Sequence, residues 1–176
     1  FISKNTGVNL LLFNTSLFDS DVSNFYDVLS RKVMRITTTA LIDFRRSDIE
    51  DYIDVLSSLN VRCVMVNSYL QRIDCGDFDL VLRAFKYAAS KGLILCVDGS
   101  YGTSKMLIYD NLDLICYLSD RIENIPIVII HSGGKRILDV MLLAMEKSNI
   151  WLDTSFSLPF YLGSSVEIDI AFAYKK

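Results

Sequence analysis

Residues 125–134 read Ile-Pro-Ile-Val-Ile-Ile-His-Ser-Gly-Gly, and this stretch decides the fold that the sequence predicts. A short apolar run that ends at a polar residue and two glycines is typical of a parallel strand, because such a strand is covered on both faces and opens into a loop at its carboxyl end. Similar runs occupy residues 7–14, 36–42, 61–67, 93–98 and 149–154. With the run at 125–131, the sequence predicts six strands.

Segments with helical periodicity separate these strands, at residues 21–31, 47–59, 78–91, 111–121, 135–147 and 165–174. Ser47, three residues before Glu50, and Asp77 are expected to cap two of the helices, and Gly92 is expected to end one in a left-handed conformation. The alternation predicts βα units in one mainly parallel sheet and a single domain over residues 1–176.

Two α/β architectures accommodate six βα units, namely part of an eight-stranded barrel and a doubly wound open sheet. The glycine fingerprint of dinucleotide-binding folds does not follow the first predicted strand, where Asn14-Thr15-Ser16 stands instead. We therefore predict a (β/α) TIM-barrel-like fold that is incomplete, with the doubly wound sheet as the alternative.

The composition argues against two classes of binding partner. The chain has 176 residues, 51% of them hydrophobic, and a net charge of −3 from interspersed acids and bases. It has no basic cluster that would bind nucleic acid and no apolar run long enough to span a membrane, so we expect neither a nucleic acid nor a membrane as a partner.

Four cysteines without a C-x-x-C pair predict free thiols in a reducing, cytoplasmic compartment. The chain begins with Phe1 and shows no leader, so we expect its natural start to be absent or processed.

Polar residues follow each apolar run, and in parallel α/β folds the carboxyl ends of the strands form a common mouth. The residues with the most relevant chemistry are Asn67, Tyr69, Asp98, His131, Ser132 and Asp153. We expect Asn67, Tyr69, Ser132 and Asp153 to contact a small-molecule substrate. The alternative for each is that a strand end is polar simply because it reaches water.

His131, the only histidine, is the leading candidate for a metal ligand, a general base or a substrate donor, with a purely structural hydrogen bond as the alternative. Asp98 ends Leu-Ile-Leu-Cys-Val-Asp in the same way on a neighbouring strand, so the pair could hold a divalent metal. Two ligands are fewer than the three that a catalytic zinc ordinarily takes from a protein.

Residues 61–102, together with the stretch from Ile125 through Asn-Ile-Trp-Leu-Asp-Thr-Ser at 149–155, resemble the amidohydrolase-related metal-dependent hydrolases. The resemblance implies a distorted TIM barrel in which the present strands are the second to the seventh. It implies that His131 matches the histidine of the sixth strand, that Asp98 stands where the fifth strand usually has its histidine, and that zinc is the expected metal. The His-x-His pair of the first strand and the aspartate of the eighth have no counterpart here.

The predicted function is therefore metal-dependent hydrolysis of a small molecule by a metal-activated water. The alternative is a degenerate barrel that binds a ligand or partner without metal. A third hypothesis is a doubly wound domain with Ser16 or Ser132 near a phosphate or sugar. The strand edges that six strands would leave exposed also predict a homo-oligomer, strand exchange or closure by residues outside this sequence.

Overall fold

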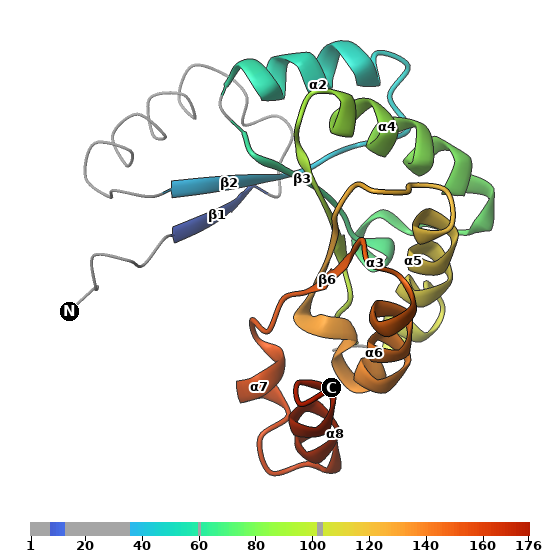
Figure 1. Ribbon diagram of the computed structural model, residues 1–176. Coiled ribbons are helices and arrows are strands. Elements are labelled where there is room, and N and C mark those ends of the chain that lie inside the picture. Colours follow the sequence, from blue (N-terminus) through green and yellow to red (C-terminus); the bar gives the residue numbers. More distant parts are fainter. Residues whose placement is uncertain (1–7, 13–35, 60, 102–103) are drawn as a thin grey trace.

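One curved parallel sheet forms the centre of the fold (Figure 1). The computed structural model describes residues 8–12, 36–59, 61–101 and 104–176. The strands are β1 (Val8–Leu12), β2 (Ile36–Leu41), β3 (Cys63–Val66), β4 (Ile94–Asp98), β5 (Ile127–Ile130) and β6 (Ile150–Leu152). Their order in the sheet is β1-β2-β3-β4-β5-β6, and every neighbouring pair is parallel.

This order confirms the barrel-like prediction. In a TIM barrel each strand pairs with the next one along the chain, whereas a doubly wound sheet reverses direction at an internal strand. The chain is thus an α/β fold of partial TIM-barrel type. All six predicted strands are present, and β2 to β6 are each shorter at one or both ends than the apolar run that predicted them.

The helices are α2 (Ile49–Ser58), α3 (Ser68–Gln71), α4 (Phe78–Ser90), α5 (Asn111–Ser119), α6 (Ile137–Glu146), α7 (Ser157–Phe160) and α8 (Ser165–Ala173). Short 3-10 turns occupy η2 (Cys75–Asp77), η3 (Ser104–Leu107) and η4 (His131–Arg136). Helices α2, α4, α5 and α6 lie along one side of the sheet (Figure 1). The predicted helix at 21–31 lies outside the described residues.

The main core lies between this helix layer and the outward-facing residues of the strands. Val64, Leu95 and Ile127 are fully buried there, together with Phe85 of α4 and Leu114 of α5. Burial of large apolar side chains stabilises each by about 1.5–3 kcal/mol relative to exposure. The core therefore holds the helices against the sheet and fixes the positions of the strand ends.

The opposite, concave face of the sheet carries a smaller cluster. Cys63, Met65 and Cys96 are buried there and pack against Leu41, Val128 and Ile130. Met65 pairs with Cys96 across β3 and β4, so the sulfur-bearing side chains lie next to each other on one face. This face would be the interior of a closed barrel.

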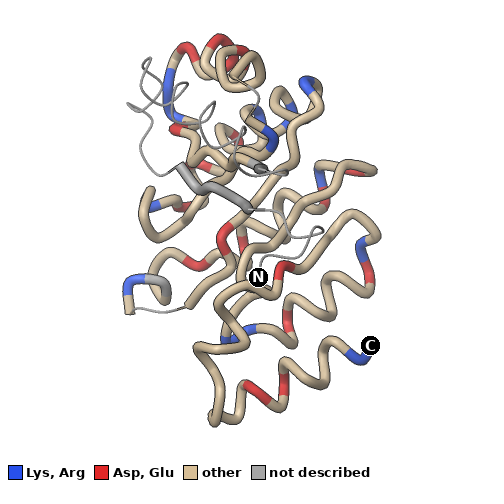
Figure 2. The backbone as a smooth tube through the Cα atoms, turned by 90° about the vertical axis from the view of Figure 1, so that its left-hand side faces the viewer, with Lys and Arg blue, Asp and Glu red and all other residues tan. Residues whose placement is uncertain are grey.

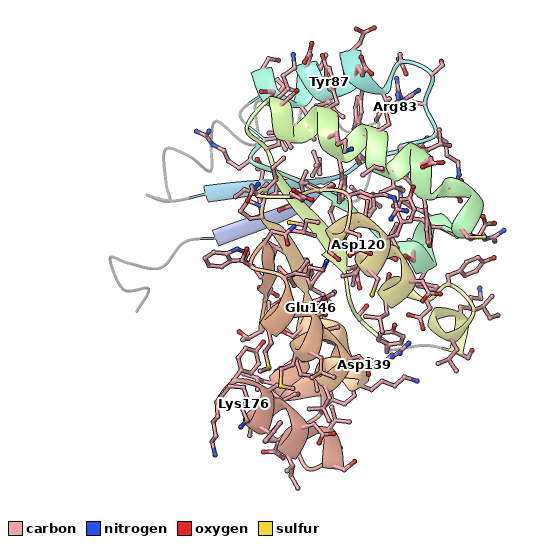
Figure 3. The ribbon with its side chains drawn as sticks, turned by 45° about the vertical axis from the view of Figure 1, so that its right-hand side comes forward. Arg83, Tyr87, Asp120, Asp139, Glu146 and Lys176 are labelled. Carbon is pink, nitrogen blue, oxygen red and sulfur yellow. The ribbon has the colours of Figure 1, made fainter. Side chains whose placement is uncertain are left out.

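Polar contacts join the helices on the outer surface. Tyr87 of α4, labelled in Figure 3, donates a hydrogen bond of 3.1 Å to Asp54 of α2, and Lys91 forms an ion pair with the same carboxylate. Basic and acidic residues are interspersed along the described chain, as Figure 2 shows. Among the described residues, no helix is both long and apolar enough to cross a membrane.

Two predicted caps are wrong and one is confirmed. Helix α2 begins after Asp48, so Ser47 is not its cap, and no side chain caps it. The Asp77 carboxylate does not cap α4, because it accepts two hydrogen bonds from the Arg45 guanidinium instead. Gly92 has a φ of +75°, the predicted left-handed conformation.

Candidate functional site

The carboxyl ends of β3, β4, β5 and β6 lie at one edge of the sheet, because these strands are parallel and neighbouring. Asn67, His131 and Asp153 directly follow β3, β5 and β6, and Asp98 is the last residue of β4. The predicted polar rim is therefore present. The hydrogen bonds of each side chain show which of its polar atoms already have partners within the protein.

Asp98 is occupied by neighbouring donors. The residue is 7% exposed, and its carboxylate accepts from the Asn67 amide at 2.8 Å and from the backbone N–H and hydroxyl of Ser100 at 2.7 and 2.5 Å. Asn67 in turn accepts from the Leu70 N–H at the start of α3. Asp98 thus joins the ends of β3 and β4, and no hydrogen bond links it to His131 in the described residues.

The His131 ring is oriented by a backbone carbonyl. Its Nδ1 atom lies 2.8 Å from the Ser155 carbonyl oxygen, which can only accept, so Nδ1 carries the proton. In the neutral ring the Nε2 atom then has a lone pair, and within the described residues it makes no hydrogen bond. A histidine held in this way presents Nε2 to a proton donor or a metal ion.

Asp153 positions the Ser155 carbonyl. Its carboxylate accepts from the Ser155 N–H at 3.1 Å and from the Ser155 hydroxyl, and it receives a long, weak contact of 3.4 Å from the His131 N–H. These bonds fix the turn after β6, and the turn fixes the imidazole. Asp153 therefore acts on His131 through Ser155.

Ser132 is buried beneath the rim, with 1% of its surface exposed. Its hydroxyl lies 2.5 Å from the Asp153 carbonyl oxygen and also contacts the Tyr174 hydroxyl. These partners tie η4 to β6 and to the end of α8. The contact of Ser132 with a substrate stays a prediction.

The loop after β5 has an unusual backbone. His131, Ser132, Gly133 and Gly134 have φ values of 62°, 52°, 81° and 52°, so four consecutive residues lie in the left-handed region. Residues other than glycine pay an energetic cost there, and such strain persists only where surrounding contacts impose it. The two glycines explain how the chain turns sharply enough to place His131 at the rim.

Aromatic residues after β6 pack beside the imidazole, and they were not among the residues predicted from the sequence. The His131 and Phe156 ring centroids are 5.4 Å apart, and Phe160 stacks on Phe156 at 4.9 Å. A crevice beside the imidazole is lined by Ser100, Tyr101, His131, Gly134, Phe156, Ser157, Phe160 and Tyr161. Its volume of about 10 Å³ is roughly what one water molecule requires. The available signal was the cluster of apolar residues, Phe-Ser-Leu-Pro-Phe-Tyr at 156–161, in a loop.

Tyr69 belongs to a different and more open part of the mouth. It lies on α3 and lines a hollow of about 360 Å³ with Leu70, Arg72, Lys105, Ile108 and Tyr109. The hollow shares no lining residue with the crevice beside His131. Of the four predicted substrate contacts, Tyr69 lines this hollow, whereas Asn67, Ser132 and Asp153 are among the lining residues of neither place.

Two buried thiols lie on the concave face of the sheet. A hydrogen bond from Cys96 lowers the pKa of the Cys63 thiol to about 7 and raises the pKa of Cys96 itself. The physical cause is that two neighbouring thiols lose their first proton easily, since the remaining S–H stabilises the thiolate, and resist losing the second. Both are free thiols, as the sequence predicted.

The described residues do not complete a metal site. No group of three or more His, Cys, Asp and Glu side chains lies close enough together among them to hold a metal ion. His131 offers one nitrogen, and both oxygens of Asp98 already accept hydrogen bonds. Zinc binding at His131 and Asp98 stays a prediction.

No family model and no curated protein matches the sequence. Among solved structures, one match is a crystal structure described as that of a "putative fructose-1,6-biphosphate aldolase" from Coccidioides immitis. It has a TM-score of 0.50 and 13% sequence identity, covering 85% of this chain and 55% of that chain. This chain therefore spans about half the length of that neighbour. At this identity the likeness shows the fold alone.

These comparisons correct the family assignment. The resemblance of residues 61–102 and 125–155 to amidohydrolase-related hydrolases is not supported by any family model, and the structural match is described as an aldolase. The assignment is therefore wrong. Its physical basis was the pattern of apolar strands ending in polar residues, which is common to TIM-barrel folds with many unrelated activities.

Proposed function

We propose that this chain forms part of a barrel-like domain that binds a small molecule at the carboxyl ends of its strands, with His131 as the group that accepts a proton or hydrogen bond from the ligand. The observation that carries the proposal is the Nδ1–H bond to the Ser155 carbonyl, which leaves the Nε2 lone pair without a partner in the described residues. An imidazole oriented in this way, in its neutral form, is suited to that role.

The crevice of about 10 Å³ beside the imidazole is too small for an organic ligand, so a ligand that occupied it would have to displace a lining side chain such as Phe156. Phe156 is 51% exposed, contacts the His131 and Phe160 rings, and has a φ of 62°, so its backbone is strained where it stands. Ligand entry would displace this ring from the imidazole and allow the backbone to relax. We infer that the narrow crevice is the closed state of the site.

A second candidate is metal-dependent hydrolysis of a small molecule, favoured by one specific observation. Histidines that ligate metals usually donate their other ring N–H to a carbonyl or carboxylate, and His131 has this arrangement. Further ligands would have to come from outside the described residues. We also propose a cytoplasmic location for the chain, on the basis of its free cysteines.

The only histidine of the chain supplies its own reporter. Nitrogen-15 NMR of the neutral imidazole should give the pattern of a proton fixed on Nδ1. A fragment library of small alcohols, amines and carboxylates is then screened for compounds that shift the His131 ring signals saturably. Isothermal titration with zinc chloride alone, without fragments, tests the second candidate.

His131→Asn is the matched variant. An asparagine amide can still donate to the Ser155 carbonyl and tolerates a positive φ, but it has no atom in place of Nε2. The proposal expects fragment binding to be lost in this variant while the melting temperature changes little. A ring proton on Nε2, or undiminished binding of every fragment hit by His131→Asn, would refute it. Zinc binding that disappears in His131→Asn would replace it with the second candidate.

A further inference from the structure

The hollow between α3 and η3 has a mixed polar and apolar lining. Its volume of about 360 Å³ falls at the lower end of the range for small-molecule sites. Leu70 and Ile108, on its wall, are 50% and 75% exposed. Apolar side chains so exposed would lose unfavourable contact with water if a ligand covered them.

The charge in the hollow is of one sign. Among the described residues that line it, Arg72 and Lys105 carry a formal charge and none is acidic. Neither forms an ion pair with a carboxylate in the part of the chain that the structure describes. Two neighbouring cations without counter-charges raise the local concentration of anions and can bind one directly.

The position of Arg72 is fixed by its backbone. It ends α3 in a left-handed conformation with a φ of 51°, and the Arg45 guanidinium donates to the carbonyl oxygens of Gln71 and Arg72 at 2.9 and 3.3 Å. Arg45 is itself held by a two-point contact with Asp77. The Arg72 side chain therefore starts from a rigid point beside the hollow.

Two phenol rings complete the lining. Tyr69 and Tyr109 come from the two sides of the hollow, and both are partly buried, so they present ring surface as well as hydroxyl groups. The flat apolar part of a ligand could stack on either ring, while the anionic part of the same ligand contacted the Arg72 guanidinium and the Lys105 ammonium.

We propose that this hollow is a binding site for a small organic anion, one with a phosphate or carboxylate head joined to a flat apolar group. Arg72 and Lys105 bind the head, and Tyr69 with Ile108 covers the apolar group. The proposal does not rest on the role of His131, since the two places share no lining residue.

Isothermal titration of the whole chain with phenyl phosphate tests the site, with inorganic phosphate and phenol as probes of each half. Phenyl phosphate should bind more tightly than either half probe, and its affinity should fall as salt is added. Arg72→Gln and Lys105→Gln should each weaken binding roughly threefold to tenfold, as expected for charge-assisted contacts at a partly exposed site. Lys86→Gln, an exposed lysine of α4 outside the hollow, is the control and should bind as the wild type does.

Tyr69→Leu separates stacking from simple apolar contact. It should reduce the preference for phenyl phosphate over phosphate without changing phosphate binding. Equal weakening by Lys86→Gln and Arg72→Gln would mean nonspecific charge attraction and would overturn the proposal, as would the absence of saturable heat. Binding lost in His131→Asn but kept in Arg72→Gln would move the anion to the imidazole and would also overturn it.

Discussion

Replacing Gly133 with alanine should destabilise the fold more than the same change at Gly92. Both glycines have a left-handed φ, +81° and +75°, so both variants carry the same backbone strain of about 1 kcal/mol. They differ in surroundings. A Cβ at Gly133 would lie 2.5 Å from the Val140 Cγ2 atom, whereas nothing lies within 4 Å of one at Gly92.

The overlap at Gly133 must be relieved by movement of α6 or of the loop, because Val140 is 1% exposed and packed in the core. Such overpacking costs about 1–3 kcal/mol. Gly133→Ala should therefore lose roughly 2–4 kcal/mol of unfolding free energy, and Gly92→Ala about 1 kcal/mol. The difference between the two losses of unfolding free energy gives the cost of the steric overlap, because the cost of the left-handed backbone is the same in both variants.

Urea unfolding followed by far-ultraviolet circular dichroism measures both values, provided that the denaturant slope is unchanged. A double variant, Gly133→Ala with Val140→Ala, removes the methyl group that the new Cβ would meet. Its loss should be smaller than the sum of the two single losses by about 1 kcal/mol or more. Equal losses for Gly133→Ala and Gly92→Ala, or strict additivity in the double variant, would refute the described packing of η4 on α6.

Two further predictions concern the buried polar groups. Asp98→Ala leaves the Asn67 amide and the Ser100 N–H without their acceptor, so urea unfolding should show a loss of roughly 2–4 kcal/mol; a loss below about 1 kcal/mol would contradict this structural role. The folded pKa of Cys63, about 7, is below its ordinary value of 9.0, so its contribution to stability is full above pH 9.0 and is lost as the pH falls through 7. Cys96→Val should remove this pH dependence, which urea unfolding at a series of pH values measures. Parallel curves of unfolding free energy against pH for the wild type and the variant would disprove the coupling of the two thiols.

The fold could be predicted from the sequence because its determinants are local. Each strand is an apolar run flanked by polar residues, and the buried face of α2 follows from Ile49, Ile53 and Leu56 at helical spacing. The alternation of strands and helices left two strand orders open, and the missing glycine fingerprint after the first strand favoured the sequential order that β1 to β6 have. The placement of Asp98 and His131 at neighbouring strand ends was predicted by the same argument.

The contacts of the site residues could not be predicted in this way. The carboxylate of Asp98 binds Asn67 and Ser100, and the His131 ring binds Ser155, because side-chain partners depend on loop conformations that pattern does not encode. Left-handed φ values at non-glycine positions such as Ser132 and Phe156 illustrate the difficulty. The family assignment failed for a related reason, since a strand pattern shared by a whole fold carries no information about chemistry.

The order of the strands has a consequence for how the chain acquires its structure. Every hydrogen-bonded neighbour in the sheet is also the next strand along the chain, so each ladder closes only the segment between two consecutive strands. Closure of short loops costs less conformational entropy than closure of long ones and is generally faster. Assembly can therefore begin at any adjacent pair of strands and extend in both directions. A cut in a loop between two units would sever one crossover connection and leave the pairings within each piece intact.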